Sequence, residues 1–395
     1  MKVGILGGTF NPIHQGHINI AEHAKRSLGL DKILLIPTNI PPHKSNEGVV
    51  DGVDRYNMCK LAARGIDYIQ VSDIELKKEG PSRTIDTLQY LSETYPFDKF
   101  FLIMGSDMFL TFRQWYKYRE IANLSTLCVF PRYFDENWGN ILVQTEYLKK
   151  EIGVHINIQD TPVLEISSTQ VRESLSKNLD TAVYLHKDVL KYINAVLLYT
   201  DKKDRQIEYY KKKVRAVLSD KRYIHSINVA KEAVRLGIIY GTNLNKAYIS
   251  GILHDIFKEN NDPNALQNLW NSGIICKEKY KNNKPLWHSV LGAEYVRLEL
   301  GVEDTDVINA IRYHTSGRAG MSDVEEVVFL ADKISLDRDY PDLEKVRNIA
   351  DISMAYGMLY VLSFSLQTLI SNEENICNDT VWAYNYYLEQ SGNNN

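Results

Sequence analysis

Short apolar runs alternate with amphipathic stretches through the first half of the chain. The runs at residues 3–6, 32–37, 100–105 and 127–131 have the length of buried strands, and helical patterns lie between them. Strands that alternate with helices are typical of an α/β doubly wound parallel sheet. Such sheets bind ligands at the carboxyl ends of their strands. We therefore expect functional residues immediately after these runs.

The second half shows helical periodicity and little strand-like alternation. Ile227 and Val234, for example, fall on one helical face. A charged segment at residues 200–205 separates the two patterns. The sequence therefore predicts an α/β domain at residues 1–199, a linker at 200–205 and an all-α domain at 206–390.

Composition narrows the class of protein. The 395 residues are enough for two domains, and the net charge of −4 gives no reason to expect a nucleic-acid partner. Four scattered cysteines without a CxxC pair fit a reducing cytoplasm. No run of about eighteen apolar residues stands out, so we expect a cytoplasmic protein without a membrane partner. The oligomeric state stays open, a homo-oligomer included.

A glycine turn and two histidines follow the first predicted strand. The sequence there is Gly-Gly-Thr-Phe-Asn-Pro-Ile-His-Gln-Gly-His, at residues 7–17. The turn lets backbone N–H groups approach an anion, and the start of the next helix adds positive potential. His14 and His17 lie on one helical face because they are three residues apart. The alternative is a tight turn whose histidines only cap the helix. The candidate phosphate-binding residues are Gly7, Gly8, Thr9, Phe10, His14 and His17.

Four later segments could complete this site. Lys44 lies in a proline-rich loop after the second strand, where it could hold a phosphate or simply face solvent. Thr84 opens a helix as a donor or as a cap. Gly105 and Asp107 end a buried strand, and Trp115 offers an aromatic face to a flat ring. The residues Ser167, Ser168, Thr169 and Arg172 begin another helix and form a second candidate anion site.

The opening motif resembles the signature of the HxGH nucleotidyltransferases, and the whole first half resembles bacterial nicotinate-nucleotide adenylyltransferases. The resemblance implies that nicotinate mononucleotide attacks the α-phosphorus of ATP, which gives deamido-NAD and pyrophosphate. It implies that His14, His17 and Arg172 act in catalysis and that Mg²⁺ bridges the phosphates. By the same resemblance Lys44 holds the mononucleotide phosphate, and Thr84 and Trp115 face the nicotinate. Ser168 and Thr169 would hold the leaving pyrophosphate with Arg172. Arg83 stands where that family often has an aromatic residue.

Histidines and aspartates recur in apolar helical contexts through the second half. Converging imidazoles and carboxylates inside a helical domain form an N/O metal site. A single histidine of this kind is more often a satisfied core residue, but an adjacent His-Asp pair, three further histidines and a late aspartate favour metal binding. The candidate ligands are His225, His254, Asp255, His288, His314 and Asp332.

This ordered set resembles the HD-domain phosphohydrolases. Residues 223–340 more narrowly resemble a bacterial subfamily that hydrolyses diadenosine tetraphosphate to two ADP. The resemblance implies a two-metal site, with iron the first expectation and manganese or zinc permitted by the ligand types. Asp255 would bridge the metals, and Lys258 would neutralise a substrate phosphate. Lys333 and Arg338 are weaker candidates that could instead form surface ion pairs.

Two alternatives to these functions remain open. The first domain could use another acceptor, such as nicotinamide mononucleotide or a phosphopantetheine. The second could be a nucleotide-sensing regulatory module or hydrolyse a different nucleotide.

Overall fold

The computed structural model describes residues 1–39, 48–78, 80–131, 138–159, 164, 166–260, 264, 267, 270 and 283–392. Lys44 therefore lies outside the described residues. Contacts divide the chain into two compact units. The first comprises residues 1–193 and 198–201, and the second comprises 194–197 and 202–395.

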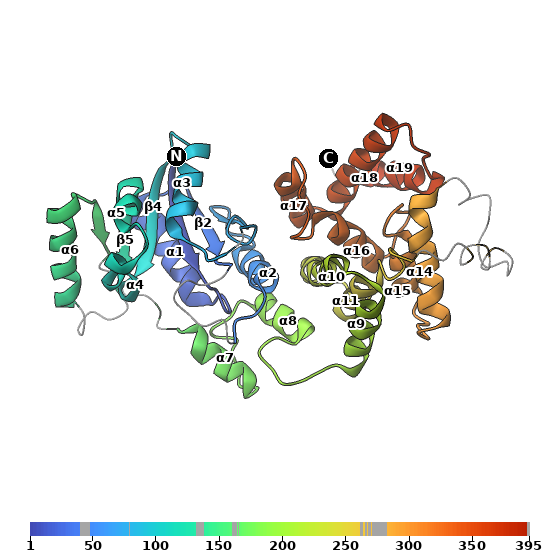
Figure 1. Ribbon diagram of the computed structural model, residues 1–395, viewed down its shortest axis with the longest axis horizontal. Coiled ribbons are helices and arrows are strands. Elements are labelled where there is room, and N and C mark those ends of the chain that lie inside the picture. Colours follow the sequence, from blue (N-terminus) through green and yellow to red (C-terminus); the bar gives the residue numbers. More distant parts are fainter. Residues whose placement is uncertain are drawn as a thin grey trace. The chain divides into compact units, whose positions relative to one another are not determined.

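The first unit is built on a six-stranded parallel sheet in the order β3-β2-β1-β4-β5-β6. Figure 1 shows the helices of this unit arranged around the sheet. The strands are β1 (Lys2–Gly8), β2 (Lys32–Pro37), β3 (Ile69–Val71), β4 (Lys99–Gly105), β5 (Ser125–Phe130) and β6 (Ile156–Ile158). The helices are α1 (Gln15–Leu28), α2 (Gly52–Ala63), α3 (Thr84–Thr94), α4 (Ser106–Leu110), η1 (Phe112–Gln114), α5 (Tyr118–Leu124), α6 (Trp138–Ile152), α7 (Ser168–Ser176) and α8 (Lys187–Val196).

The strand order reverses between β1 and β4, which are neighbours in the sheet. Gly8 of β1 lies opposite Pro37 of β2, and Ile5 lies opposite Leu102 of β4. A reversal of this kind opens a crevice at the carboxyl ends of the two strands, where doubly wound sheets bind ligands. The loop after β1 and the residues after β4 therefore flank the same crevice.

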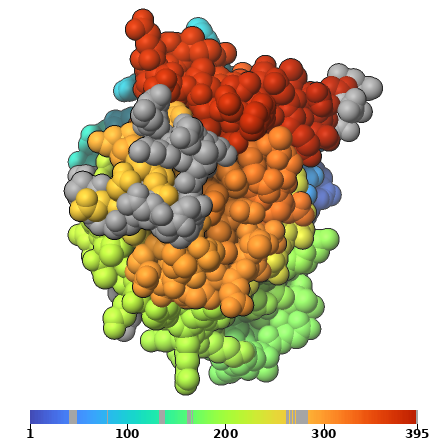
Figure 2. Space-filling view, turned by 90° about the vertical axis from the view of Figure 1, so that its right-hand side faces the viewer, coloured from blue at the N-terminus to red at the C-terminus, as the bar shows by residue number. Residues whose placement is uncertain are grey.

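The second unit is helical throughout its described residues. Its elements are α9 (Arg205–Val217), α10 (Asp220–Tyr240), α11 (Leu244–Leu253), η2 (Lys284–Leu286), α14 (Trp287–Leu298), α15 (Thr305–Tyr313), α16 (Asp323–Ile334), α17 (Leu343–Ile352), α18 (Met354–Ser371) and α19 (Asn378–Gly392). Figure 2 shows the face on which the C-terminal helices (red) lie above α14 and α15 (orange). The predicted fold class, an α/β doubly wound parallel sheet followed by an all-α domain, is confirmed.

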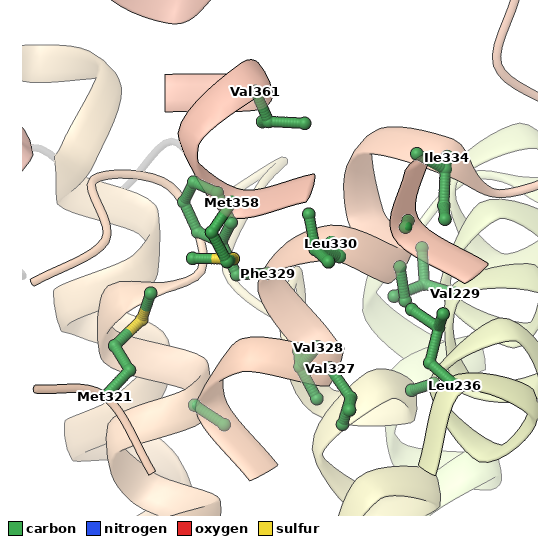
Figure 3. Close-up of a cluster of buried hydrophobic side chains, with 14 of the residues drawn as sticks. Val229, Leu236, Met321, Val327, Val328, Phe329, Leu330, Ile334, Met358 and Val361 are labelled. Atoms are coloured by element: carbon green, nitrogen blue, oxygen red, sulfur yellow. The ribbon is translucent and has the colours of Figure 1, made fainter. Parts of the chain in front are cut away.

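A large apolar core holds the second unit together. Figure 3 shows side chains from α10, α16 and α18 pointing into it, among them Val229, Phe329 and Met358. Helices α10 and α11 approach closely at Gly251, where an added Cβ would lie 2.4 Å from the Cα of Ala230. This close approach brings the C-terminal end of α11 beside α10.

Helix α18 is long and apolar. Its 18 residues carry no Asp, Glu, Lys or Arg, and their mean hydropathy is 1.3. By length and composition alone it could cross a membrane. Four of its residues are buried in this unit. The prediction of no membrane partner stays a prediction.

Candidate functional sites

The two histidines of the first unit stack at the start of α1. Their ring centroids are 3.7 Å apart with an interplanar angle of 29°. The backbone N–H of His14 donates to Nδ1 of His17 at 3.2 Å, so His17 does take part in capping the helix. The same bond orients the His17 ring, and Phe10 packs its edge against that ring at 5.0 Å. Both imidazoles therefore have defined positions in the loop that flanks the crevice.

The start of α7 contacts this loop, although the two segments are more than 150 residues apart in the sequence. Ser168 Oγ donates to the carbonyl of Pro12 at 3.0 Å, and Arg172 Nη1 donates to the carbonyl of Asn11 at 2.8 Å. Arg172 Nη2 also reaches Thr169 Oγ1 at 3.3 Å. The side chain of Ser167 caps α7. The structure thus joins one candidate anion site to the other.

Arg55 is a positioning residue that sequence reasoning missed. Its side chain is buried and donates to the carbonyls of Thr9 and Thr38 at 2.9 and 2.6 Å, and to Val50 at 3.0 Å. It therefore ties the loop after β1 to the end of β2. No sequence signal distinguishes it, because an arginine in a helix usually faces solvent. Tyr199 has a related role, since its hydroxyl donates to Asn11 Oδ1 at 2.8 Å.

The remaining candidates of the first unit lie on separate segments. Gly105 ends β4 and Asp107 lies in the first turn of α4, both beside the crevice. Thr84 begins α3, and Trp115 packs on Phe112 with ring centroids 5.5 Å apart.

Arg83 contacts an aromatic ring. Its guanidinium lies 4.4 Å from the ring centroid of Tyr116, which is the geometry of a cation–π contact. This contact joins the start of α3 to the segment after β4.

Five of the six candidate ligands of the second unit converge in two overlapping groups. The first contains His225 of α10, His254 after α11 and Asp332 of α16. His225 Nε2 lies 3.0 Å from Asp332 Oδ1, and His254 Nε2 lies 3.8 Å from the same oxygen. Figure 1 shows these three helices lying together. All three side chains are buried.

The second group contains His254, Asp255 and His314, with His288 beside it. Asp255 Oδ1 lies 3.4 Å from His314 Nε2 and 3.3 Å from His288 Nε2. The Nε2 atoms of His288 and His314 are 3.2 Å apart. Because His254 belongs to both groups and Asp255 lies next to it, the six ligands form one cluster.

Backbone and carboxylate partners orient the imidazoles toward the centre of this cluster. His254 Nδ1 lies 2.8 Å from the carbonyl of Gly251, and His314 Nδ1 lies 2.8 Å from the carbonyl of Ile311. Asp337, which sequence reasoning missed, holds His225 Nδ1 at 2.7 Å. Partners of this kind present the opposite ring nitrogen, Nε2, as the metal-binding atom.

Protonation and unpaired atoms test whether this donor set suits a metal. Burial lowers the pKa of His254 to about 3 and that of His288 to about 4, so both are neutral and able to coordinate at neutral pH. Burial opposes the charge on Asp255, but the neighbouring His254, His288 and His314 outweigh this effect and lower its pKa. His254 Nε2 and Asp255 Oδ1 are buried and make no hydrogen bond. The residues therefore fit a divalent cation.

Four cations surround the cluster. Lys258 Nζ lies 3.1 Å from His288 Nε2 and 3.8 Å from Asp255 Oδ1, and burial lowers its pKa. Arg222 lies 3.4 Å from Asp255. Lys333 and Arg338 are half-buried, and both form ion pairs with the buried carboxylate of Asp332. The site thus combines metal ligands with groups that suit phosphate oxygens.

Two known families match the two units. Residues 5–174 match the cytidylyltransferase-like family, and residues 222–337 match the HD domain. Fold and site together define a nucleotidyltransferase-like unit followed by an HD domain. A "Probable nicotinate-nucleotide adenylyltransferase" from Caldicellulosiruptor bescii is 38% identical over 193 residues, which cover 49% of this chain and 96% of that protein. The chain belongs to the nicotinate-nucleotide adenylyltransferase family.

Two further proteins are similar to parts of the chain. The nicotinate-nucleotide adenylyltransferase of Bacillus subtilis is 36% identical over 198 residues, which cover 50% of this chain and 98% of that protein. A crystal structure of a "predicted HD superfamily hydrolase involved in NAD metabolism" from Clostridium acetobutylicum is 29% identical. It covers 46% of this chain and 97% of its own, with a TM-score of 0.45. The narrower resemblance to diadenosine tetraphosphate hydrolases stays a prediction.

Proposed function

We propose that the chain is a bifunctional enzyme and that its first unit transfers the adenylyl group of ATP to nicotinate mononucleotide. The products are deamido-NAD and pyrophosphate. The observation that carries this proposal is the stacked pair His14 and His17 at the crevice, with Arg172 hydrogen-bonded to the same loop. The family membership of residues 1–199 supports the choice of acceptor.

Positioning and charge neutralisation account for the chemistry of this unit. The acceptor phosphate attacks the α-phosphorus in line, and the negative charge that develops needs donors already in place. His14 and His17 supply imidazole donors there, while Ser168, Thr169 and Arg172 hold the departing pyrophosphate. Mg²⁺ would bridge the phosphates mainly through water and ATP oxygens. Lys44 would hold the mononucleotide phosphate.

Replacing His17 by alanine tests the transferase. Loss of one preorganised donor at a developing charge lowers turnover by roughly 100-fold or more. The measurement is steady-state formation of deamido-NAD by the full chain from ATP and nicotinate mononucleotide. The same assay with nicotinamide mononucleotide or phosphopantetheine identifies a different acceptor.

A matched control lies on the same helix. His23 is in α1 but outside the motif, so His23→Ala should leave turnover within about twofold. Near-normal turnover of His17→Ala in a folded protein would refute the catalytic assignment.

We further propose that the second unit hydrolyses diadenosine tetraphosphate to two ADP with a bound divalent metal. His225, His254 and Asp332 would hold one ion, and His288 and His314 would hold a second, with Asp255 between them. Such ions polarise a phosphoryl oxygen and lower the pKa of bound water. Lys258 then neutralises charge on the polyphosphate from its position beside Asp255.

Metal reconstitution tests the hydrolase. The full chain is stripped with a chelator and assayed for ADP release after addition of Fe²⁺, Mn²⁺ or Zn²⁺. We expect metal-dependent hydrolysis that His254→Ala abolishes, because His254 belongs to both ligand groups. Tight nucleotide binding without turnover under every metal would instead identify a sensing module.

A further inference from the structure

A cavity of about 690 Å³ in the second unit begins beside the cluster of candidate metal ligands. Thr315, Lys333 and Arg338 line the near end. Thr315 Oγ1 lies 3.3 Å from His288 Nε2, and Lys333 Nζ lies 2.7 Å from Asp332 Oδ2. The cavity therefore starts at side chains that contact the candidate metal ligands, and its near end carries two positive charges.

Three aromatic side chains also belong to the cavity wall. Tyr340, Tyr360 and Phe364 line it, and the rings of Tyr340 and Phe364 stack with centroids 5.7 Å apart at an angle of 21°. The hydroxyl of Tyr340 donates to the carbonyl of Lys333 at 3.1 Å, which fixes this ring relative to the charged end. Glu374 and Asn375 add polar groups to the same wall.

The combination of cations and aromatic rings in one cavity matches the chemistry of a nucleotide. Phosphate oxygens are held by Lys and Arg, and a nucleobase stacks on an aromatic side chain. The volume lies within the range of about 300–1,000 Å³ found for small-molecule sites, which is far more than a single phosphate occupies. The polar groups offer partners to the edge of a base.

We propose that this cavity binds the nucleoside end of the substrate while Lys333 and Arg338 guide its phosphates to the metal cluster. The inference rests on the proposed phosphohydrolase activity and adds to it the place in the fold where the base of the substrate is recognised.

Removal of one ring tests the proposal. Phe364→Ala deletes a half-exposed side chain, so folding should be preserved. We expect the KM for diadenosine tetraphosphate to rise about 10-fold with little change in kcat, since a lost base stack weakens binding by roughly that factor. Hydrolysis of inorganic tripolyphosphate, which has no base, should be unchanged. Tyr356→Ala is the control, because Tyr356 is an exposed ring of α18 that does not line the cavity.

The outcomes separate this inference from the proposed activity. An unchanged KM for Phe364→Ala, or an equal loss on tripolyphosphate, overturns the nucleoside site while leaving the hydrolase intact. If the wild type hydrolyses neither compound, the proposed activity fails, and calorimetric titration of the full chain with ADP still tests the cavity. The transferase unit is identical in all variants, so a selective weakening of one ADP site by Phe364→Ala supports the inference, and identical isotherms refute it.

Discussion

Single atoms decide how the histidines of the second unit can act. His254 and His314 turn Nε2 inward because Nδ1 meets a backbone carbonyl, whereas His225 depends on the carboxylate of Asp337. Asn228 in turn donates to Asp337 at 3.1 Å. A carboxylate partner makes the ligating nitrogen more basic as well as fixing the ring.

Asp337→Asn should therefore weaken metal binding by about 10- to 100-fold without unfolding the protein. The amide can still hydrogen-bond to the ring, but it carries no negative charge to favour the metal-bound imidazole. Competition with a chelator of known affinity measures the effect. Asp339→Asn, an exposed neighbour, should bind metal like the wild type. Equal affinities in the two variants would remove Asp337 from the site.

At the scale of elements, the close approach of α10 and α11 places His254 and Asp255 opposite His225. Gly251 permits it because its missing side chain leaves room for the backbone of Ala230. Long periodic segments such as α10 could be predicted from sequence because their period is a local property. Strands β3 and β6, with three residues each, were not predicted, since so short a run has no distinct period.

Gly251→Ala should lower the free energy of unfolding by about 2–3 kcal/mol and weaken metal binding. The new Cβ would lie 2.4 Å from backbone that cannot rotate away, so the helices must separate. Gly292→Ala in α14 is the matched control, because its nearest neighbour is a side-chain carbon at 3.5 Å. That variant should stay within about 1 kcal/mol of the wild type. Urea denaturation of the full chain, monitored by circular dichroism, compares the free energies of unfolding of the two variants.

At the scale of the whole molecule, buried polar pairs tie distant helices together and make stability depend on pH. Tyr387 of α19 donates to Glu326 Oε1 of α16 at 2.7 Å. Burial raises the pKa of Glu326 to about 7, and the nearby charges of Asp323 and Glu325 act in the same direction. The folded state therefore holds this proton more tightly than the unfolded chain does.

A carboxyl group whose pKa is raised by folding stabilises the folded state fully below its unfolded pKa, which is about 4.5. This contribution is lost as the pH rises through its folded pKa, which is about 7. The wild type should lose about 2 kcal/mol of stability from this group between pH 5 and 8. Glu326→Gln keeps an acceptor for Tyr387 but does not titrate, so its loss over the same range should be smaller by that amount. The free energy of unfolding of the wild type and of Glu326→Gln, measured at both pH values, tests this prediction. Equal losses in the two proteins would contradict the raised pKa of Glu326.

The sequence by itself determined the two periodic patterns, the glycine-histidine turn and the ordered histidines and aspartates, because periodicity and motif spacing are local along the chain. Only the tertiary structure decided that Arg172 reaches Asn11, that Arg55 holds the loop after β1 and that Asp337 orients His225. It also decided that a cavity extends from the cluster of candidate metal ligands to the aromatic rings of Tyr360 and Phe364 on α18. These contacts depend on which elements become neighbours, since a buried polar group takes its partner from whichever segment packs against it.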